Sequence, residues 1–553
     1  MSRMFIVRSC TSLLLPCLGF ALASCGSLPK KNAAKTIITA RSQPLKGHGK
    51  VAPRFQGTEF LTFEELRSLA RNPHPEGELK QKLNRFFSRP IISNEAWYSG
   101  VRPRLNQNET LGDFLRIATW NIEKSIHAHE AAEMLLSRAA FEKLIIPEYA
   151  PEGSPEREAL LRERDRLITA DVVLLQENDI GATRSGYRDA AREAAQALGM
   201  NYAFAPQQLE IDPVKLGLEP GRDSKGRLVK RTPDASRYKG VFGISVLSKH
   251  PIRSAQCVQL KSQPYDWYAG EKAKTDIMED ARRLASEVVF ENETEREMKV
   301  GGRIFFRVDL DVPGLPNNTL TIIHNHLEIK ATARGREEQL DEIFRYIRDI
   351  PHTVVMAGDF NSSSVDLSPT STWRVLKRAT ADPQNWLGVG VNLAMQASTL
   401  INTGRALLNA GKNLHSPLAP HIPILFPNKK RRLFTNVRDF RFADGGRFDF
   451  RGDSERSINR STATLANSNE KAIKGQTPTF SVRRPIGPIG RGRLDWIFVK
   501  APPASQTLGK HSYRLAPHFG ETLLGIGRKL KVKLSDHSPC VADIPLQEPP
   551  GIK

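Results

Sequence analysis

The sequence predicts an α/β protein in which helices pack in layers against β-sheets. Short apolar runs rich in β-branched residues alternate with amphipathic stretches of helical spacing along most of the chain. Residues 156–168 form one such helical stretch and lead directly into the apolar run 171–177, a helix-to-strand unit typical of layered α/β folds. With 553 residues, 39% of them hydrophobic, the chain is long enough to bury a large core.

The first 25 residues are expected to be an export signal and not part of the fold. A short basic region precedes an apolar stretch, residues 13–23, that is too short to span a bilayer. Leu22-Ala23-Ser24-Cys25-Gly26 resembles the cleavage box of bacterial lipoproteins, in which the cysteine becomes the lipid-modified first residue. An ordinary signal cut near Ala23 is the alternative. We therefore expect an exported protein held at the bacterial cell envelope, in the periplasm or on the outer membrane face, by acyl chains on Cys25.

Cysteine usage points to free thiols. Cys10 and Cys17 leave with the signal and Cys25 carries lipid, so only Cys257 and Cys540 remain in the folded body. Each lies inside an apparent strand, which favours two buried free thiols over one disulfide. No Cys/His spacing typical of a metal site is present in the sequence.

The chain is strongly basic, with a formal net charge of +21. An excess of Lys and Arg favours polyanionic partners, such as nucleic acid, anionic lipid head groups or lipopolysaccharide-like phosphate. Because basic exported proteins are common, this charge biases the choice of substrate without identifying it.

We expect four regions: a lipoprotein signal at 1–25, a flexible tether at 26–55, an N-terminal helical extension at 56–110 and a large domain at 111–547. In the extension, a Thr/Glu capping pattern at Thr62 opens one helix, and a second is expected around residues 79–87. The stretch 368–480 is a long insertion that contains a basic cluster at 429–432. We expect it to cover part of the core, with membrane contact as the less favoured alternative.

Within the large domain, amphipathic helices are predicted at 130–145, 156–168, 187–198 and 336–347. Gly199 is the expected C-cap of the third. A buried strand at 240–248 is followed by a turn in which His250 is expected to be exposed. Arginines near the end of the insertion are candidate phosphate contacts: Arg483, Arg484, Arg491 and Arg493.

Six apolar strands carry Asp, Glu, Asn or His at one end. The apolar run 354–357 is expected to stop at a tight turn at Gly358 and to present Asp359 and Asn361 on one side. The other strand ends carry Asn121, Glu123, Glu177, His326, Asp495, Asp536 and His537. Converging carboxylates repel one another unless a cation or protons intervene. An oxygen-rich cluster with few His and no Cys favours Mg²⁺ or Mn²⁺ over zinc.

These strand ends form an ordered set of motifs: W-N-I-E, L-Q-E, N-H-L, G-D-F-N, R-L-D-W-I and S-D-H-S-P. The set resembles the endonuclease/exonuclease/phosphatase superfamily, which includes pancreatic deoxyribonuclease, apurinic endonucleases, bacterial sphingomyelinases and inositol-polyphosphate 5-phosphatases. All six motifs occur in the family's order and span residues 115–544. The resemblance implies a four-layer α/β/β/α sandwich of two packed mixed sheets flanked by helices.

The resemblance also implies roles in attack of water on a phosphoester. His537 is the candidate base, because imidazole titrates near neutral pH. The resemblance assigns Asp495 as the carboxylate that fixes its tautomer. Asp359 would orient the nucleophile, and His326 would donate a hydrogen bond to the phosphate.

By the same resemblance, Glu177 would bind the metal, with Glu123 and Asp536 beside it. The metal, Mg²⁺ or alternatively Mn²⁺, would bind phosphate and offset charge on the leaving oxygen. Asn121 and Asn361 would bind the substrate by donating to phosphoryl oxygen or by positioning water.

The expected function is therefore a metal-dependent phosphoester hydrolase at the exported bacterial surface, of the phosphodiesterase or nuclease kind. Charge slightly favours nucleic acid over a phospholipid head group as substrate, and a sphingomyelinase-like or phosphoinositide-specific enzyme is the alternative. A second alternative is a surface-anchored protein that binds polyanions without turnover.

Overall fold

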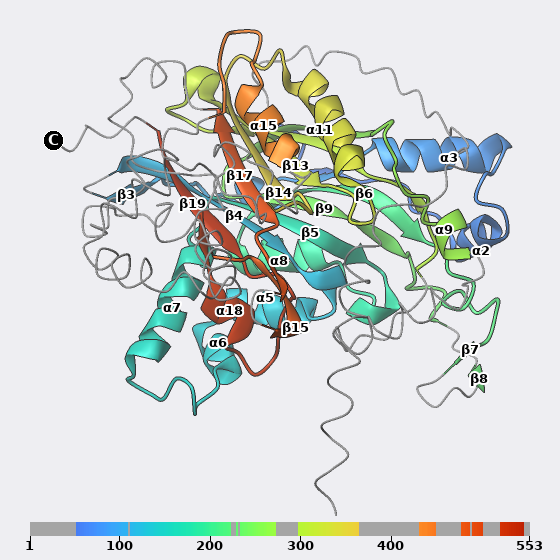
Figure 1. Ribbon diagram of the computed structural model, residues 1–553, viewed down its shortest axis with the longest axis horizontal. Coiled ribbons are helices and arrows are strands. Elements are labelled where there is room, and N and C mark those ends of the chain that lie inside the picture. The colour runs from blue at the N-terminus through green and yellow to red at the C-terminus, as the bar shows by residue number, and fades with distance from the viewer. Residues whose placement is uncertain are drawn as a thin grey trace, which may run out of the picture.

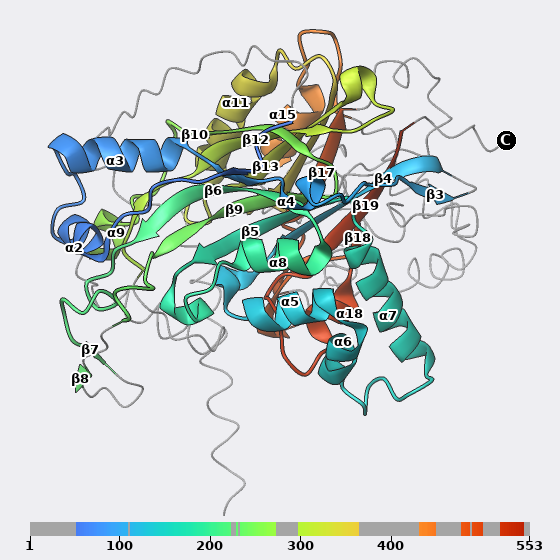
Figure 2. The same ribbon diagram turned by 180° about the vertical axis from the view of Figure 1, so that it is seen from behind.

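Two β-sheets pack face to face, and helices cover both outer faces (Figures 1 and 2). The computed structural model describes residues 51–108, 111–222, 228–229, 233–272, 297–363, 431–448, 477–486, 489–500 and 520–546. The predicted signal with Cys25, nearly all of the tether and most of the insertion lie outside the described residues. The four-layer α/β/β/α sandwich is confirmed.

The first sheet contains ten strands in the described part of the chain, in the order β1-β2-β6-β9-β5-β4-β19-β18, with β11 beside β6 and β3 beside β4. It is mixed, because β4 and β5 are parallel while the other pairs are antiparallel. Its strands are β1 (Phe55–Gln56), β2 (Ile91–Ser93), β3 (Asn106–Asn108), β4 (Gly112–Asn121), β5 (Val172–Ile180), β6 (Asn201–Glu210), β9 (Val241–Ser248), β11 (Lys299–Gly301), β18 (Glu521–Thr522) and β19 (Cys540–Pro545).

The second sheet has the order β10-β12-β13-β14-β17. Here β13 and β14 are parallel and the remaining pairs antiparallel. Its strands are β10 (Ile252–Gln259), β12 (Ile304–Asp311), β13 (Thr319–His326), β14 (Thr353–Asp359) and β17 (Asp495–Lys500). Two short hairpins lie outside both sheets: β7 (Gly221–Arg222) with β8 (Leu228–Val229), and β15 (Phe480–Ile486) with β16 (Ile489–Gly492).

The space between the sheets is filled by apolar side chains that alternate along the strands. Ile117 and Val246 of the first sheet and Ile322 and Val355 of the second belong to this buried cluster. Cys257 and Cys540 are also part of it as free thiols, which confirms that interpretation. This dry interface fixes the two sheets against each other and therefore fixes the relative positions of their strand ends.

Helices form the two outer layers. Figure 1 shows α11 and α15 over the second sheet, and α5 to α8 on the opposite side of the molecule over the first. The helices are α2 (Phe63–Arg71), α3 (Gly77–Ser88), α4 (Glu95–Tyr98), α5 (Ala128–Leu136), α6 (Arg138–Leu144), α7 (Pro155–Ile168), α8 (Ala190–Leu198), α9 (Ala269–Lys272), α11 (Ala333–Ile347), α15 (Arg431–Asp439) and α18 (Leu524–Arg528).

Local signals explain most helix boundaries. Thr62 and Glu65 form the predicted capping box at the start of α2, and Gly199 ends α8 in the left-handed conformation. The single helix predicted at 130–145 is instead two, because Ser137 is extended and its hydroxyl caps the start of α6.

The N-terminal extension adds more than helices. Its strand β2 pairs with β6, and β1 pairs with β2, so the extension widens the first sheet at the edge opposite β18. Of the described parts of the insertion, residues 431–448 pack against the second sheet through Leu433, Phe434 and Phe448. This segment covers the outer face of that sheet together with α11.

Two further local predictions are wrong. The strand β14 does not stop at Gly358 but continues to Asp359. Gly358 has φ +135°, and a Cβ placed there would lie 1.9 Å from the carbonyl oxygen of Asn325, so the glycine permits close approach of β13. His250 is buried and not exposed, and the side-chain amide of Asn201 donates to its carbonyl at 3.2 Å. None of the helices in the described ranges is both long and apolar enough to cross a bilayer.

Candidate active site

Polar side chains from both sheets meet at one end of the sandwich. In the second sheet, Asp359 on β14 is the direct register partner of His326 on β13 and of Asp495 on β17. From the first sheet, the side-chain amide of Asn121, the last residue of β4, donates to Asp359 Oδ2 at 3.2 Å. The predicted convergence of these strand ends is therefore present.

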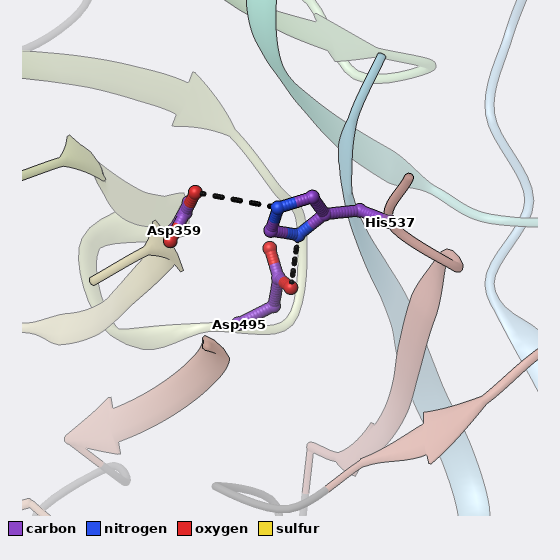
Figure 3. Close-up of side chains that lie close together, drawn as sticks. All are labelled: Asp359, Asp495 and His537. Carbon is purple, nitrogen blue, oxygen red and sulfur yellow. Dashed lines mark hydrogen bonds and ion pairs between the residues drawn. The ribbon is translucent and has the colours of Figure 1, made fainter. Parts of the chain in front are cut away.

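His537 lies between two buried carboxylates (Figure 3). Its Nδ1 is 2.8 Å from Asp495 Oδ2, a hydrogen bond, and its Nε2 is 3.8 Å from Asp359 Oδ2. The imidazole thus has one nitrogen committed to Asp495 and the other directed at Asp359. This is the arrangement that a His base and its orienting carboxylate require.

Electrostatics favour a proton on this imidazole. Burial alone would lower the pKa of His537, but the hydrogen bond and attraction of Asp495 outweigh burial and raise that pKa well above its ordinary value. Burial raises the pKa of Asp359 to about 6, an effect that His537 opposes and Asp495 reinforces. His537 and the two carboxylates beside it, Asp359 and Asp495, therefore bind a proton readily as a group.

Glu177 lies beside this group at an irregularity in β5. The strand continues past Glu177, where the sequence predicted its end, and the register with β9 shifts between Leu175 and Asn178. Glu177 itself has φ +62°, an uncommon conformation for a residue with a side chain. Such a bulge re-aims a side chain, and here the carboxylate reaches the amide of Asn121 at 3.2 Å.

The turn that follows β4 holds Glu177 from the other side. Residues Glu123, Lys124 and Ser125 all have positive φ, and the backbone N–H of Lys124 donates to Glu177 Oε2 at 3.0 Å. The backbone N–H of Glu123 donates to Asn121 Oδ1 at 3.0 Å. The predicted metal residue Glu123 therefore stands at the rim of the same site.

His326 and Asn361 complete the set from the second sheet. His326 Nε2 lies 3.8 Å from Glu177 Oε1 and 3.9 Å from Asp359 Oδ2. Burial, with the nearby cation of Arg303, lowers the pKa of His326 well below its usual range, so the ring is neutral. Asn361 is not extended but has φ +46°, and its amide donates to the Leu327 carbonyl while its backbone N–H donates to Asp359. It therefore fixes the loop that carries Asp359.

The donors present fit a divalent cation. Burial raises the pKa of Asp536, and repulsion from Glu177 adds to this against the opposing effect of His537. Glu177 and Asp359 also share the amide of Asn121. Carboxylate oxygens are the hard ligands that Mg²⁺ prefers.

Asp359, Asp495 and His537 offer ligand atoms within 4.8 Å of one another, and they too could hold a cation. A cation on this group could bind His537 through Nε2 and leave the 2.8 Å hydrogen bond between Nδ1 and Asp495 in place. Glu177 and this three-residue group are therefore both candidates to hold a metal.

Two supporting residues were not predicted, although both lie inside the motifs. The indole N–H of Trp120 donates to the His537 carbonyl at 3.1 Å. The hydroxyl of Ser535 donates to the Asn121 carbonyl and accepts from the His537 N–H, which joins the loop before β19 to the end of β4. Their positions in the sequence could have indicated this role, because Trp120 directly precedes Asn121 and Ser535 lies two residues before His537. The candidate phosphate contact Arg493, in contrast, is fully buried and donates to the Thr477 carbonyl.

The model of the endonuclease/exonuclease/phosphatase family matches residues 118–537, which include every one of these side chains. The chain belongs to this family. Members of the family are hydrolases that act on phosphoester bonds, and they generally depend on a divalent metal. No curated protein sequence gives a significant match.

Solved structures of family members are similar to the chain at low identity. An endonuclease/exonuclease/phosphatase protein from Beutenbergia cavernae has 16% identity and a TM-score of 0.34, with 78% of this chain and 72% of that chain covered. A 3'-5' exonuclease from Neisseria meningitidis has 13% identity and a TM-score of 0.33, with 78% and 99% covered. A sphingomyelinase C from Streptomyces griseocarneus has 16% identity and a TM-score of 0.25, with 78% and 99% covered. Similarities this low do not discriminate between substrates.

Proposed function

We propose that this protein is a Mg²⁺-dependent phosphodiesterase of the exported bacterial surface that attacks phosphate with water activated by His537 and Asp495. The observation that carries the proposal is the placement of His537 between two buried carboxylates, 2.8 Å from Asp495 and 3.8 Å from Asp359. A binding protein without turnover has no need of an imidazole oriented in this way. The non-catalytic alternative is therefore less favoured.

Proton transfer follows from this geometry. A water molecule can bridge the 3.8 Å between His537 Nε2 and Asp359 Oδ2 with a hydrogen bond to each. In its neutral form, His537 would take the proton of that water as it attacks phosphorus, and Asp495 would stabilise the resulting imidazolium through Nδ1. Asp359 would orient the water toward the phosphate.

The hydrogen-bond donors beside this pair, His326 and Asn121, would bind the phosphate. His326 is neutral and buried beside Glu177, so it can donate a hydrogen bond to a phosphoryl oxygen without bringing a charge. Asn121 uses its side-chain amide on Glu177 and Asp359. Its predicted substrate contact requires one of these hydrogen bonds to be released, whereas Asn361 acts by holding the loop of Asp359.

Glu177, with Asp536 and Glu123, would hold the metal. When bound, Mg²⁺ would polarise the phosphate and offset negative charge on the leaving oxygen. Mn²⁺ has the same ligand preference and is the alternative ion.

Nucleic acid is the substrate we favour, on the basis of the net charge of +21. A phospholipid head group is the alternative, because anionic lipid surfaces attract a basic protein equally well. Export and anchoring through Cys25 are proposed from the sequence of the first 26 residues.

The test is hydrolysis by the chain from Gly26 onward, assayed on DNA, RNA, sphingomyelin and phosphoinositides with Mg²⁺ or with EDTA. We expect Mg²⁺-dependent cleavage of nucleic acid that is lost in Glu177→Ala and in His537→Ala. The matched control is His74→Ala, which removes an exposed histidine from the N-terminal extension and should leave cleavage unchanged. Cleavage of lipid alone would overturn the choice of substrate, and full activity in His537→Ala would overturn the mechanism.

A further inference from the structure

The last residues of the insertion contact the catalytic group. Residues 477–481 run beside the loop that carries His537, and Phe480 and His537 form an isolated antiparallel bridge. The carbonyl of Thr479 accepts from the Ser538 N–H at 2.8 Å, and the Ser481 N–H donates to the Asp536 carbonyl at 2.9 Å. The chain therefore returns from the insertion directly onto the residues on both sides of His537.

Thr479 also contacts Asp495, the hydrogen-bond partner of His537. Its hydroxyl accepts hydrogen bonds from the backbone N–H of Leu494 at 3.0 Å and of Asp495 at 3.2 Å. The Thr479 side chain is fully buried, so neither donor could turn to water if the hydroxyl were removed. One residue thus ties the backbone of Asp495 to the backbone beside His537.

Phe480 packs against the imidazole itself. The centroids of the Phe480 and His537 rings are 5.2 Å apart with an interplanar angle of 56°. Asp495 restrains the ring through Nδ1, but a single hydrogen bond leaves rotation about that bond unrestrained. Contact with an aromatic face supplies the second restraint.

We propose that Thr479 and Phe480 are positioning residues of this site: Thr479 fixes the backbone of Asp495 relative to His537, and Phe480 fixes the plane of the imidazole. This inference rests on the proposed function, since it assigns both residues to the Asp495–His537 pair. It also gives the C-terminal end of the insertion a role beyond covering the sheet. Neither residue touches the phosphate in this role; both act through the pair.

The decisive comparison is between Thr479→Val and Thr479→Ser. Valine keeps the volume and removes the hydroxyl, so Asp495 loses its anchor. Because a displacement of about 1 Å at a reacting group costs on the order of a hundredfold, we expect kcat to fall roughly 10- to 100-fold with KM unchanged. Serine keeps the hydroxyl and should restore kcat to within about twofold of the wild type. Phe480→Ala should lower kcat in the same way, and Phe480→Leu should restore part of it.

Thr353→Val is the matched control. Thr353 is also a buried threonine in the second sheet, at the opposite end of β14 from Asp359, and its hydroxyl has no hydrogen-bond partner among the described residues. This substitution should leave kcat and KM at wild-type values. Thermal unfolding of all variants shows which of them are folded, and Thr479→Ala replaces the valine variant if that protein does not fold.

The outcomes separate the two proposals. A wild-type kcat in Thr479→Val, or an equal loss in Thr479→Val and Thr479→Ser, overturns the positioning role while the hydrolase assignment stands. If the wild type hydrolyses none of the substrates, the proposed function fails. The positioning role is then judged by NMR of the full chain, in which the hydrogen-bonded Nδ1 proton of His537 should be observed in the wild type and in Thr479→Ser. Its persistence in Thr479→Val would overturn the role.

Discussion

Asp359 and Asp495 are direct register partners on the antiparallel strands β14 and β17, and their carboxylates lie at opposite nitrogens of His537. The pairing of two strands therefore sets the positions of both acids. A slip of one residue would turn one of the two side chains to the other face of the sheet. Strand register thus determines the geometry of the candidate site.

The first prediction concerns Asp495. Asp495→Asn keeps the shape of the side chain but removes the charge that stabilises the imidazolium and selects its tautomer. We expect kcat to fall roughly 10²- to 10⁴-fold with little change in KM, measured by steady-state hydrolysis. Asp165→Asn, at an exposed position on α7, is the control and should match the wild type. An Asp495→Asn protein within about tenfold of the wild type would contradict the assigned role.

The second prediction concerns the metal. Mg²⁺ or Mn²⁺ should raise the unfolding temperature, since a ligand that binds only the folded state stabilises it by about 2.7 kcal/mol at a hundred times Kd. Glu177→Gln should weaken Mn²⁺ binding, measured by calorimetry, by at least about tenfold. Glu158→Gln, at an exposed position on α7, should bind as the wild type does. Equal binding by Glu177→Gln would place the ion elsewhere.

The third prediction concerns Gly358. A Cβ at this position would lie 1.9 Å from the Asn325 carbonyl oxygen, and φ is +135°, so alanine creates both a clash and backbone strain. Gly358→Ala should destabilise the fold by about 3 kcal/mol or more, measured by urea unfolding. Gly112→Ala provides the comparison, because Gly112 has φ +64° with no atom within 4 Å and should cost only about 1 kcal/mol. Equal losses in the two variants would mean that the contact with β13 is unimportant.

The fourth prediction concerns acid stability. Burial lowers the pKa of His250 to about 4, so the unfolded chain takes up a proton there before the folded one does. Stability contributed by neutral His250 is complete above about pH 6.5 and is lost as pH falls toward 4. This histidine should account for about 2–3 kcal/mol of the loss in unfolding free energy between pH 7 and pH 4.5. Between these pH values, the unfolding free energy of His250→Leu should therefore fall by about 2–3 kcal/mol less than that of the wild type. The unfolding free energy of His74→Gln, a variant at an exposed histidine, should depend on pH as that of the wild type does.

Much of the site could be predicted because strand ends are local features of the sequence. An apolar run followed by Asn or His marks the last residue of β4 and of β13, where the structure places Asn121 and His326. An Asp before an apolar run marks the first residue of β17, Asp495. The layered fold follows from the alternation of such runs with amphipathic helices.

What could not be predicted depends on partners distant in the sequence. The local sequence around Gly358 predicts a turn, because the reason for this glycine is its close contact with Asn325, which lies on another strand. The bulge at Glu177 arises from pairing with β9, and the burial of His250 from packing that a polar turn does not reveal. Thr479 and Phe480 lie in the insertion, where nothing in the local pattern marks them as neighbours of His537.

The pairing of β19 with β4 has a consequence for when the protein becomes active. β4 provides Asn121, whereas His537 immediately precedes β19, far later in the chain. A nascent polypeptide that does not yet contain His537 lacks one half of the candidate site. The site is therefore assembled only once β19 has paired with β4.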